Sequence, residues 1–207
     1  HYYQSTANGP VNRVVSRVDA KGKIVNIGNE KGTTSASFSP DMAYMTLNYS
    51  SVTTPPRYTF CSSNGKELRV LEDNAELASR YNHLPQKEFF TMNSEGYTLN
   101  GYMVKPLNFS SSRKYPVIMS QYSGPGSQEV LDRWKIDWEY FFVEQGYLVI
   151  CVDGRGTGGR GKEFKDCVYR QLGHYETIDQ INAAKYVKSL PCVSTVGIYG
   201  WSYGGYE

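Results

Sequence analysis

The 207-residue sequence has only three histidines, four cysteines and no strong excess of either charge. The formal net charge is +2 and no long basic or acidic run occurs, which argues against nucleic acid or an anionic membrane surface as a partner. No apolar run approaches the roughly 18 residues of a membrane-spanning helix, so we expect no membrane span. We also expect no signal peptide within the chain.

The spacing of the four cysteines argues against a zinc site. They stand at positions 61, 151, 167 and 192 and form no C-x-x-C pair, the usual basis of a zinc site. We therefore expect no metal and no cofactor. Cys151 lies in an apolar run and is expected to be a small core residue, and a disulfide between two of the others is left open.

Residues 1 to about 72 alternate short β-favouring runs with tight turns, which predicts an all-β region. Asn64-Gly65 is a strong hairpin signal between two such runs. The turn at Phe38-Ser39-Pro40-Asp41, followed by an aromatic strand, is similar to the first turn of many β-propeller blades. About one and a half blades would fit here, and a small sandwich or barrel is the alternative. Strands are expected at 11–18, 24–27, 34–38, 43–49, 58–62 and 66–71.

The pattern changes after a polar connection at about 72–85. Strands are then expected at 88–92, 97–104, 115–122, 147–152 and 195–199, and helices at 130–145 and 175–190. The last helix places Ile178, Ile181, Ala184 and Val187 on one face. Alternating strands and helices predict a parallel α/β sheet. The expected fold is thus the end of a β-propeller followed by the first half of an α/β-hydrolase fold.

The stretch Gly200-Trp201-Ser202-Tyr203-Gly204 fits G-x-S-x-G, the nucleophile elbow of α/β-hydrolases. In that turn the serine has strained backbone geometry, and a side chain at either flanking glycine would collide with the neighbouring strand and helix. The short apolar run before the motif supports this interpretation over an ordinary Gly-Ser turn.

Two other loops follow predicted buried strands, at the sheet edge where ligand groups gather. Tyr122 lies where an α/β-hydrolase needs a second oxyanion donor, and its phenol could supply one. A packing role for Tyr122 is equally compatible with its position. The loop from Asp153 to Gly161 contains G-x-G-x-x-G, which raises a dinucleotide site as a rival interpretation. That alternative requires a helix that opens near Gly159. Otherwise the arginines of this loop are tied by ion pairs or line a substrate entrance.

A serine nucleophile needs a base, and the histidines offer no clear one. His1 and His83 lie outside the predicted α/β part, and His174 is expected to be a surface or capping residue. In α/β-hydrolases the acid and the histidine follow the serine in the chain. We therefore expect both to lie beyond Glu207, and we expect the chain to be an inactive part of a longer enzyme.

Several ordered motifs together resemble the dipeptidyl peptidase IV family of prolyl oligopeptidase-type serine peptidases, close to its bacterial members. The resemblance runs the whole length. It is carried by Leu71-Glu72-Asp73-Asn74, Tyr122-Ser123-Gly124-Pro125-Gly126-Ser127-Gln128, Asp153-Gly154-Arg155-Gly156, Gln171-Leu172-Gly173, Asp179-Gln180-Ile181 and Gly200-Trp201-Ser202-Tyr203-Gly204-Gly205-Tyr206.

The resemblance implies release of N-terminal dipeptides from peptides with proline, or less well alanine, second. It implies that Ser202 is the nucleophile, that Tyr122 gives the side-chain oxyanion donor and that Tyr203 gives the backbone N–H and a wall of the proline pocket. The domains would be 1–80, the C-terminal part of a propeller with its linker, and 81–207, the N-terminal half of the hydrolase domain. A homodimeric parent and a periplasmic or envelope location, with secretion as the alternative, are further expectations.

Two other functions remain open at this point. A related propeller-capped peptidase could release tripeptides or cut internally, and the family's amine-binding glutamates, which would decide this, belong to a segment outside the chain. A non-catalytic binding protein on the same fold is the alternative from another class. The presence of both Ser202 and Tyr122 argues against it, because a protein without catalysis has no need to keep both.

Overall fold

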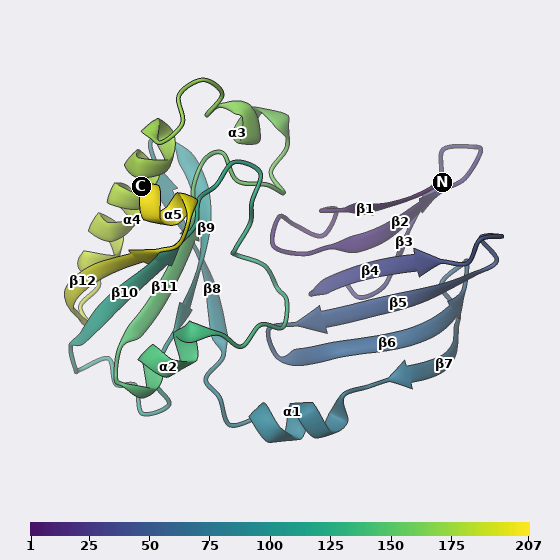
Figure 1. Ribbon diagram of the computed structural model, residues 1–207, viewed down its shortest axis with the longest axis horizontal. Coiled ribbons are helices and arrows are strands. Elements are labelled where there is room, and N and C mark those ends of the chain that lie inside the picture. Colours follow the sequence, from purple (N-terminus) through teal and green to yellow (C-terminus); the bar gives the residue numbers. More distant parts are fainter. The chain divides into compact units, whose positions relative to one another are not determined.

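The computed structural model describes residues 1–207, which form two compact units (Figure 1). The β unit contains residues 1–83 and 131–135, and the α/β unit contains residues 84–130 and 136–207. No helix in the structure is long and apolar enough to cross a membrane. All four cysteines are free thiols.

The β unit consists of two antiparallel sheets and one short helix. The first sheet has the order β1-β2-β3 and the second the order β4-β5-β6-β7, a four-stranded meander of the kind that forms a propeller blade. Its elements are β1 (Tyr2–Ser5), β2 (Val14–Val18), β3 (Ile24–Ile27), β4 (Thr33–Phe38), β5 (Tyr44–Ser51), β6 (Thr54–Ser62), β7 (Glu67–Glu72) and α1 (Ala75–Tyr81).

Two predicted turns join the strands of the second sheet. Asn64-Gly65 connects β6 to β7, with Gly65 at a φ of 93° that suits glycine. The turn between β4 and β5 is closed by Asp41, whose Oδ1 accepts hydrogen bonds from Ser39 Oγ and the Ala43 N–H. Val15, Ile27, Met45 and Cys61 form the buried cluster of this unit. The all-β prediction for this part of the chain is confirmed, and β1 is a strand that the sequence pattern did not predict.

The segment 131–135 belongs to the β unit, although it was predicted to be helical. Its backbone and side chains hydrogen-bond to three strands or turns there: the Asp132 N–H donates to the Val11 carbonyl, Asp132 Oδ1 accepts from the Val52 N–H, and the Trp134 N–H donates to Ser50 Oγ. These bonds replace helical ones, so helix α2 (Trp138–Glu144) is only the second half of the predicted 130–145 helix.

The α/β unit is built on one five-stranded sheet with the order β12-β10-β11-β9-β8. Strands β10, β11 and β12 are parallel, whereas β9 pairs antiparallel with both β8 and β11. The elements are β8 (Lys87–Ser94), β9 (Tyr97–Val104), β10 (Tyr115–Gln121), α2, β11 (Leu148–Asp153), α3 (Lys162–Asp166), α4 (His174–Lys188), β12 (Val193–Gly200) and α5 (Tyr203–Tyr206).

The order of the parallel strands decides where a site can form. The chain moves from β10 to β11 through α2, and then returns across β10 to β12 through α4. Because such crossovers are right-handed, α2 and α4 cover opposite faces of the sheet (Figure 1). The direction of winding therefore reverses at β10, and a crevice is expected at the carboxyl ends of β10 and its neighbour.

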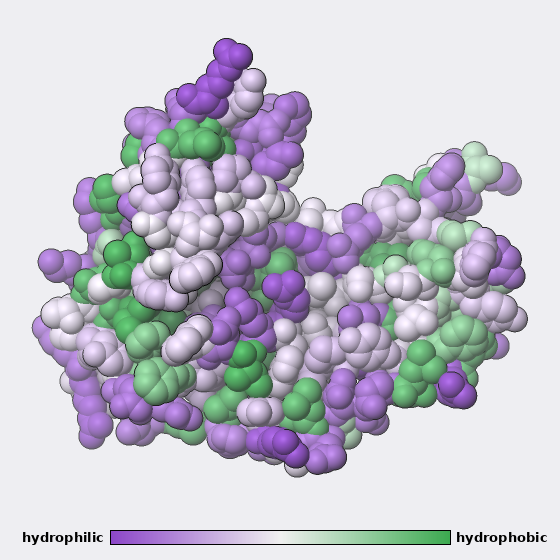
Figure 2. Space-filling model, viewed as in Figure 1, coloured by the Kyte–Doolittle hydropathy of each residue, from purple (hydrophilic) through white to green (hydrophobic).

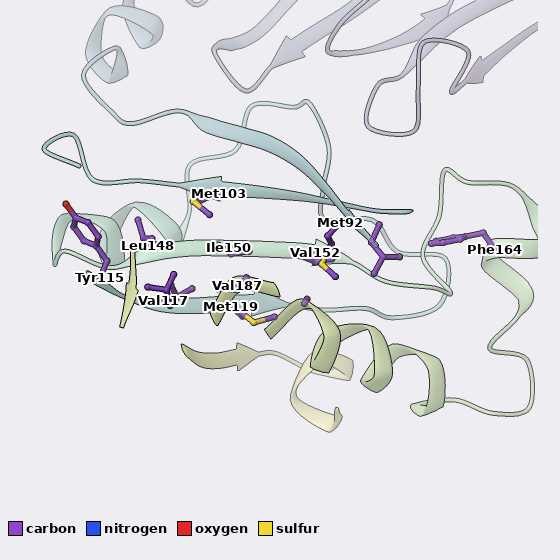
Figure 3. Packing of buried hydrophobic residues seen from close by; sticks show 13 residues of the cluster. Met92, Met103, Tyr115, Val117, Met119, Leu148, Ile150, Val152, Phe164 and Val187 are labelled. Atoms are coloured by element: carbon purple, nitrogen blue, oxygen red, sulfur yellow. The ribbon is translucent and has the colours of Figure 1, made fainter. Parts of the chain in front are cut away.

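The core of the α/β unit lies along strands β10 and β11 (Figure 3). Val117 and Met119 of β10 and Leu148, Ile150 and Val152 of β11 are buried, as expected for strands with both faces covered. Figure 3 shows Met119 close to Val187, a buried residue of α4. Cys151 of β11 is also buried, which confirms it as a small core residue.

Helix α4 does not bury the face that its apolar residues suggested. Its buried residues are Glu176, Asp179, Gln180, Ala183 and Val187, whereas Ile181 is exposed. The three polar ones bond to loops at the carboxyl edge of the sheet, described below, and that bonding orients the helix. Ile181 instead lines an apolar groove of about 430 Å³ beside Met119 and Val196. Apolar residues (green) gather over this side of the unit in Figure 2. On β12, Ile198 is 60% exposed.

Candidate active site

Ser202 stands on a sharp turn between β12 and α5, as a nucleophile elbow requires. Its backbone has φ 56° and ψ −117°, a strained conformation for a residue other than glycine, and its side chain is exposed. A Cβ on Gly200 would overlap the Gly204 carbonyl, and a Cβ on Gly204 would overlap the Gln121 carbonyl of β10. Both glycines are therefore required by close approach of backbone, which confirms the steric prediction made from the motif.

Tyr122 and the elbow lie at the carboxyl ends of adjacent strands. Gln121, the last residue of β10, pairs with Gly200, the last residue of β12, so Tyr122 and Ser202 follow neighbouring strands at the same edge. The Tyr122 ring packs over Gly124, where a Cβ would lie 2.5 Å from the ring atom Cε1. Its centroid is 6.5 Å from that of Tyr203, with the ring planes inclined at 51°. The structure thus brings the three predicted site residues together.

Tyr203 offers two groups to this edge. It is the first residue of α5, and its backbone N–H makes no hydrogen bond within the chain. Its phenol donates a 2.8 Å hydrogen bond to Oε1 of Glu176, a fully buried residue in the first turn of α4. Burial and this bond to a carboxylate raise the pKa of Tyr203. The phenol therefore remains protonated and donates to Glu176. The backbone N–H has no partner and can donate to a ligand.

The loop that carries Tyr122 is anchored on β11. Asp153, the buried last residue of that strand, accepts hydrogen bonds from the Glu129 N–H at 3.1 Å and the Val130 N–H at 2.8 Å. Burial raises the pKa of Asp153 to about 7, although the two backbone donors oppose the shift. The Gly126 N–H also donates to the Gly156 carbonyl, and the Gly158 N–H donates to the Ser127 carbonyl. The loop after Tyr122 is thus held by the loop after β11.

The glycine-rich loop is organised by Arg155. Its buried guanidinium pairs with Asp179 at 2.8 Å and with Glu95 at 2.9 Å, and it lies over the ring of Tyr175. Burial disfavours the charged guanidinium, but the hydrogen bonds and charges of Asp179 and Glu95 outweigh it and raise the pKa of Arg155. Of the two predicted roles for these arginines, Arg155 has the ion-pair role.

The dinucleotide alternative for this loop does not fit the structure. It requires a helix opening at Gly159 to receive a pyrophosphate, yet Gly159 lies in a bend. The next helix, α3, begins at Lys162 and has only five residues. No group of three histidine, cysteine or acidic side chains is arranged to hold a metal ion.

The histidine of the α/β unit does not serve Ser202 here. His174 begins α4, is exposed, and packs the edge of its ring on Tyr175. The Ser202 hydroxyl makes no hydrogen bond within residues 1–207. The arrangement thus places an exposed serine hydroxyl, the Tyr122 phenol and the Tyr203 N–H at one sheet edge, without a base bonded to the serine.

Four buried polar residues around these groups were not predicted from the sequence: Glu176, Gln121, Ser123 and Gln180. Ser123 and Gln180 entered the sequence analysis only as members of longer motifs, and no role was assigned to Gln121 or Glu176. One sequence feature could have indicated them. Gln121 ends an apolar strand, and a buried amide at that position must have a hydrogen-bond partner.

Comparison with known proteins agrees with this arrangement. Residues 1–56 match the family described as dipeptidyl peptidase IV N-terminal region, and residues 134–207 match the prolyl oligopeptidase family. A probable dipeptidyl-aminopeptidase B of Arthroderma benhamiae is 36% identical over 99% of this chain, and a probable dipeptidyl peptidase 4 of Aspergillus flavus is 37% identical over 83%. The chain spans 24% of the length of each of these relatives.

Solved structures of similar proteins share the fold. The crystal structure of Porphyromonas gingivalis dipeptidyl peptidase 4 is 47% identical and matches 99% of this chain with a TM-score of 0.95, over 30% of its own length. A putative dipeptidyl aminopeptidase IV from Bacteroides ovatus is 30% identical and matches 94% of this chain with a TM-score of 0.80, over 29% of its length. The all-β region followed by an α/β-hydrolase region is therefore confirmed, and the chain belongs to the dipeptidyl peptidase IV family of prolyl oligopeptidase-type serine peptidases.

Proposed function

We propose that residues 1–207 contribute the nucleophile and the oxyanion hole of a serine exopeptidase that releases N-terminal dipeptides from peptides. The observation that carries the proposal is the juxtaposition of two carboxyl strand ends. Ser202 is exposed on a strained elbow after β12, and Tyr122 follows the adjacent strand β10. The names of the relatives, dipeptidyl-aminopeptidase and dipeptidyl peptidase, support the size of the released unit.

In this proposal Ser202 Oγ attacks the carbonyl carbon of the second peptide bond, and its proton passes to a base. The carbonyl oxygen becomes an oxyanion, which accepts hydrogen bonds from the Tyr122 phenol and the free N–H of Tyr203. The base returns the proton to the departing amine, which leaves a dipeptidyl ester on Ser202. Water then attacks this ester by the same steps, releases the dipeptide and restores the serine.

The base and its acidic partner are proposed to come from segments outside residues 1–207. The support is length, because the chain spans 24% of its curated relatives. On the same basis we propose that residues 1–80 are the C-terminal part of a propeller with its linker, and that residues 81–207 are the first half of the hydrolase domain. The division of the structure after His83 supports this boundary.

We further propose that the residue before the cleaved bond is proline, or less well alanine. The support is the family resemblance together with the aromatic surroundings of the elbow. The Tyr203 ring neighbours those of Tyr122 and Tyr206, at centroid distances of 6.5 and 5.6 Å. A wall of rings suits proline, because proline is rigid and apolar and has no N–H that a dry pocket would leave unpaired.

Two properties of the whole enzyme complete the proposal. We propose a homodimer, which light scattering of the full-length enzyme would test. We also propose a periplasmic or envelope location, with secretion as the alternative, supported by the likeness to proteins of Porphyromonas gingivalis and Bacteroides ovatus. Fractionation of the source cells would test the location.

The test of the activity uses the full-length enzyme and two chromogenic reporters, Gly-Pro-p-nitroanilide and Ala-Ala-Pro-p-nitroanilide. We expect turnover of the dipeptide reporter, a strong preference for it over the tripeptide reporter, and covalent labelling by a fluorophosphonate. Ser202→Ala should abolish turnover and labelling. Preference for the tripeptide reporter would replace the proposal by a tripeptidyl peptidase, and unchanged labelling of Ser202→Ala would remove Ser202 as the nucleophile.

A further inference from the structure

We infer that a buried relay of three side chains, Gln180, Ser123 and Gln121, positions the oxyanion tyrosine Tyr122 against the nucleophile elbow. The relay runs from helix α4 through both residues that flank Tyr122 and ends on the backbone of Gly204 in α5. The inference rests on the proposed function, because it assigns these side chains a task in the same reaction. None of them reaches the reacting atoms in this assignment, so they are positioning residues.

The hydrogen bonds of the relay all run in one direction. Gln180 Nε2 donates to Ser123 Oγ at 3.0 Å and also to the Val152 carbonyl of β11 at 2.9 Å. Ser123 Oγ donates to Gln121 Oε1 at 2.9 Å. Gln121 Nε2 then donates to the Gly204 carbonyl at 2.6 Å. Ser123 and Gln121 each accept a hydrogen bond from one neighbour and donate one to the next, whereas Gln180 only donates and its Oε1 has no partner. The three side chains and the Gly204 carbonyl thus form one continuous chain.

Burial of the three relay side chains makes departures from this hydrogen-bonded arrangement costly. Ser123, Gln180 and Gln121 are 2%, 5% and 6% exposed, so little of each side chain is open to water. In such surroundings a hydrogen bond is stronger than in water, and an unpaired polar group is costly. A shift of Ser123 would break two bonds at once. The relay therefore resists displacement of the residues on both sides of Tyr122.

The backbone conformation of Ser123 is unfavourable and requires stabilising contacts. Ser123 has a φ of 55°, in the left-handed region that a serine seldom adopts. This turn directly after Tyr122 places Gly124 against the Tyr122 ring, which leaves no room for a Cβ there. The two hydrogen bonds of the Ser123 hydroxyl fix this unfavourable turn. The ring position thus depends on a conformation that the relay maintains.

The far end of the relay fixes the other oxyanion donor. Gly204 directly follows Tyr203, whose free N–H is the second proposed donor. By holding the Gly204 carbonyl, Gln121 ties the elbow to the strand end from which Tyr122 departs. The two oxyanion donors are consequently linked through buried bonds rather than through the exposed surface.

The test compares Ser123→Ala with the parent full-length enzyme. We expect kcat for Gly-Pro-p-nitroanilide to fall about tenfold with little change in KM, because a misplaced oxyanion donor affects the transition state more than substrate binding. In the Tyr122→Phe background the same substitution should have almost no further effect on kcat, since the donor that it positions is already gone. An equal loss in both backgrounds would overturn the inference.

Two further variants keep the result interpretable. Ser123→Gly also removes the hydroxyl but accepts the positive φ, so it should fold even if Ser123→Ala does not, and it should show the same fall in kcat. Ser16→Ala is the matched control. It removes a buried hydroxyl that bonds to Asn26 and Ser5 in the β unit, so it should cost stability and leave kcat unchanged. A fall in kcat for Ser16→Ala as large as that for Ser123→Ala would make the effect one of general stability.

A second readout does not depend on activity. In protein labelled with 3-fluorotyrosine, the Tyr122 signal is identified by its loss in Tyr122→Phe. We expect Ser123→Ala and Ser123→Gly to shift or broaden this signal and Ser16→Ala to leave it in place. An unchanged Tyr122 signal in both Ser123 variants would overturn the relay even if the enzyme is active. A moved signal in an enzyme without peptidase activity would instead reject the proposed function and keep the relay as a positioning device.

Discussion

The phenol of Tyr203 donates a 2.8 Å hydrogen bond to Glu176 Oε1, and this carboxylate is fully buried in the first turn of α4. The second oxygen, Oε2, has no hydrogen-bond partner. A buried carboxylate with so few donors depends strongly on each one it has. Tyr203, the residue after Ser202, is therefore a structural partner of α4, and this bond sets the orientation of its ring.

Tyr203→Phe is accordingly expected to destabilise the protein by about 1–3 kcal/mol, because it leaves a buried hydrogen-bond acceptor unpaired. Urea unfolding followed by circular dichroism would measure the loss. Tyr206→Phe is the matched control, since Tyr206 is 69% exposed and its phenol makes no hydrogen bond, so its effect should stay within about 0.5 kcal/mol. Equal losses in the two variants would show that the bond to Glu176 does not matter.

The two glycines that follow Tyr203 should respond very differently to alanine. A Cβ at Gly204 would overlap the Gln121 carbonyl, and neither backbone can move without disturbing the sheet edge. A Cβ at Gly205 would approach the Gly200 carbonyl only to 3.3 Å, which a small shift can relieve. Gly204→Ala should therefore cost about 1–3 kcal/mol of stability and most fluorophosphonate labelling, as expected for overpacking.

Gly205→Ala, by contrast, should label at a rate close to that of the parent enzyme. Labelling is measured in the full-length enzyme, with unfolding curves of both variants recorded beside it. If Gly204→Ala labels as fast as Gly205→Ala, the elbow is less tightly packed against β10 than the structure indicates.

The sequence predicted the strands and the elbow well because both depend on local chemistry. Turn residues such as Asn64-Gly65 and apolar runs such as 148–152 carry their own signal, since they reflect backbone preference and complete burial. The predicted helix over 130–145 was wrong in its first half for the opposite reason. Asp132 and Trp134 form hydrogen bonds with residues that are distant in the sequence, namely Val11, Val52 and Ser50. A local sequence pattern cannot predict such bonds.

The site shows the same division. Ser202 and Tyr122 follow strand ends, and strand order alone brings them to one edge. The orientation of α4 could not be predicted, because its apolar residues suggested a face that includes Ile181, which is exposed. The helix instead turns Glu176, Asp179 and Gln180 inward, where each meets a polar group of a loop or of the elbow. Buried polar pairs of this kind depend on two distant partners and are invisible in a single periodic pattern.

Asp153 is expected to make stability fall as the pH rises. Burial raises its pKa to about 7 in the folded protein, against about 3.9 in an unfolded chain. Between these values the folded state binds the extra proton, so this carboxyl stabilises the fold most below pH 4 and loses that contribution as the pH rises through 7. The slope is at most about 1.4 kcal/mol per pH unit.

Asp153→Asn provides the comparison, because asparagine does not titrate. Urea unfolding of both proteins from pH 4.5 to 8 should show the stability of the parent falling relative to the variant up to about pH 7 and then levelling off. The variant should also be less stable at every pH, since an amide NH2 must face the N–H of Glu129 or Val130. A difference that stays flat, or that grows with pH, would mean that Asp153 is ionised in the fold.

Tyr122→Phe tests the oxyanion hole itself. The substitution keeps the ring that packs over Gly124 and removes only the hydroxyl, so folding should be unaffected. If the phenol donates to the oxyanion, kcat on Gly-Pro-p-nitroanilide should fall about 10²–10³-fold, while KM changes little because the bond forms mainly in the transition state. Tyr199→Phe removes a phenol from β12, just before the elbow, and should retain the parent kcat. A Tyr122→Phe enzyme as fast as Tyr199→Phe would leave the N–H of Tyr203 as the donor on which the reaction depends.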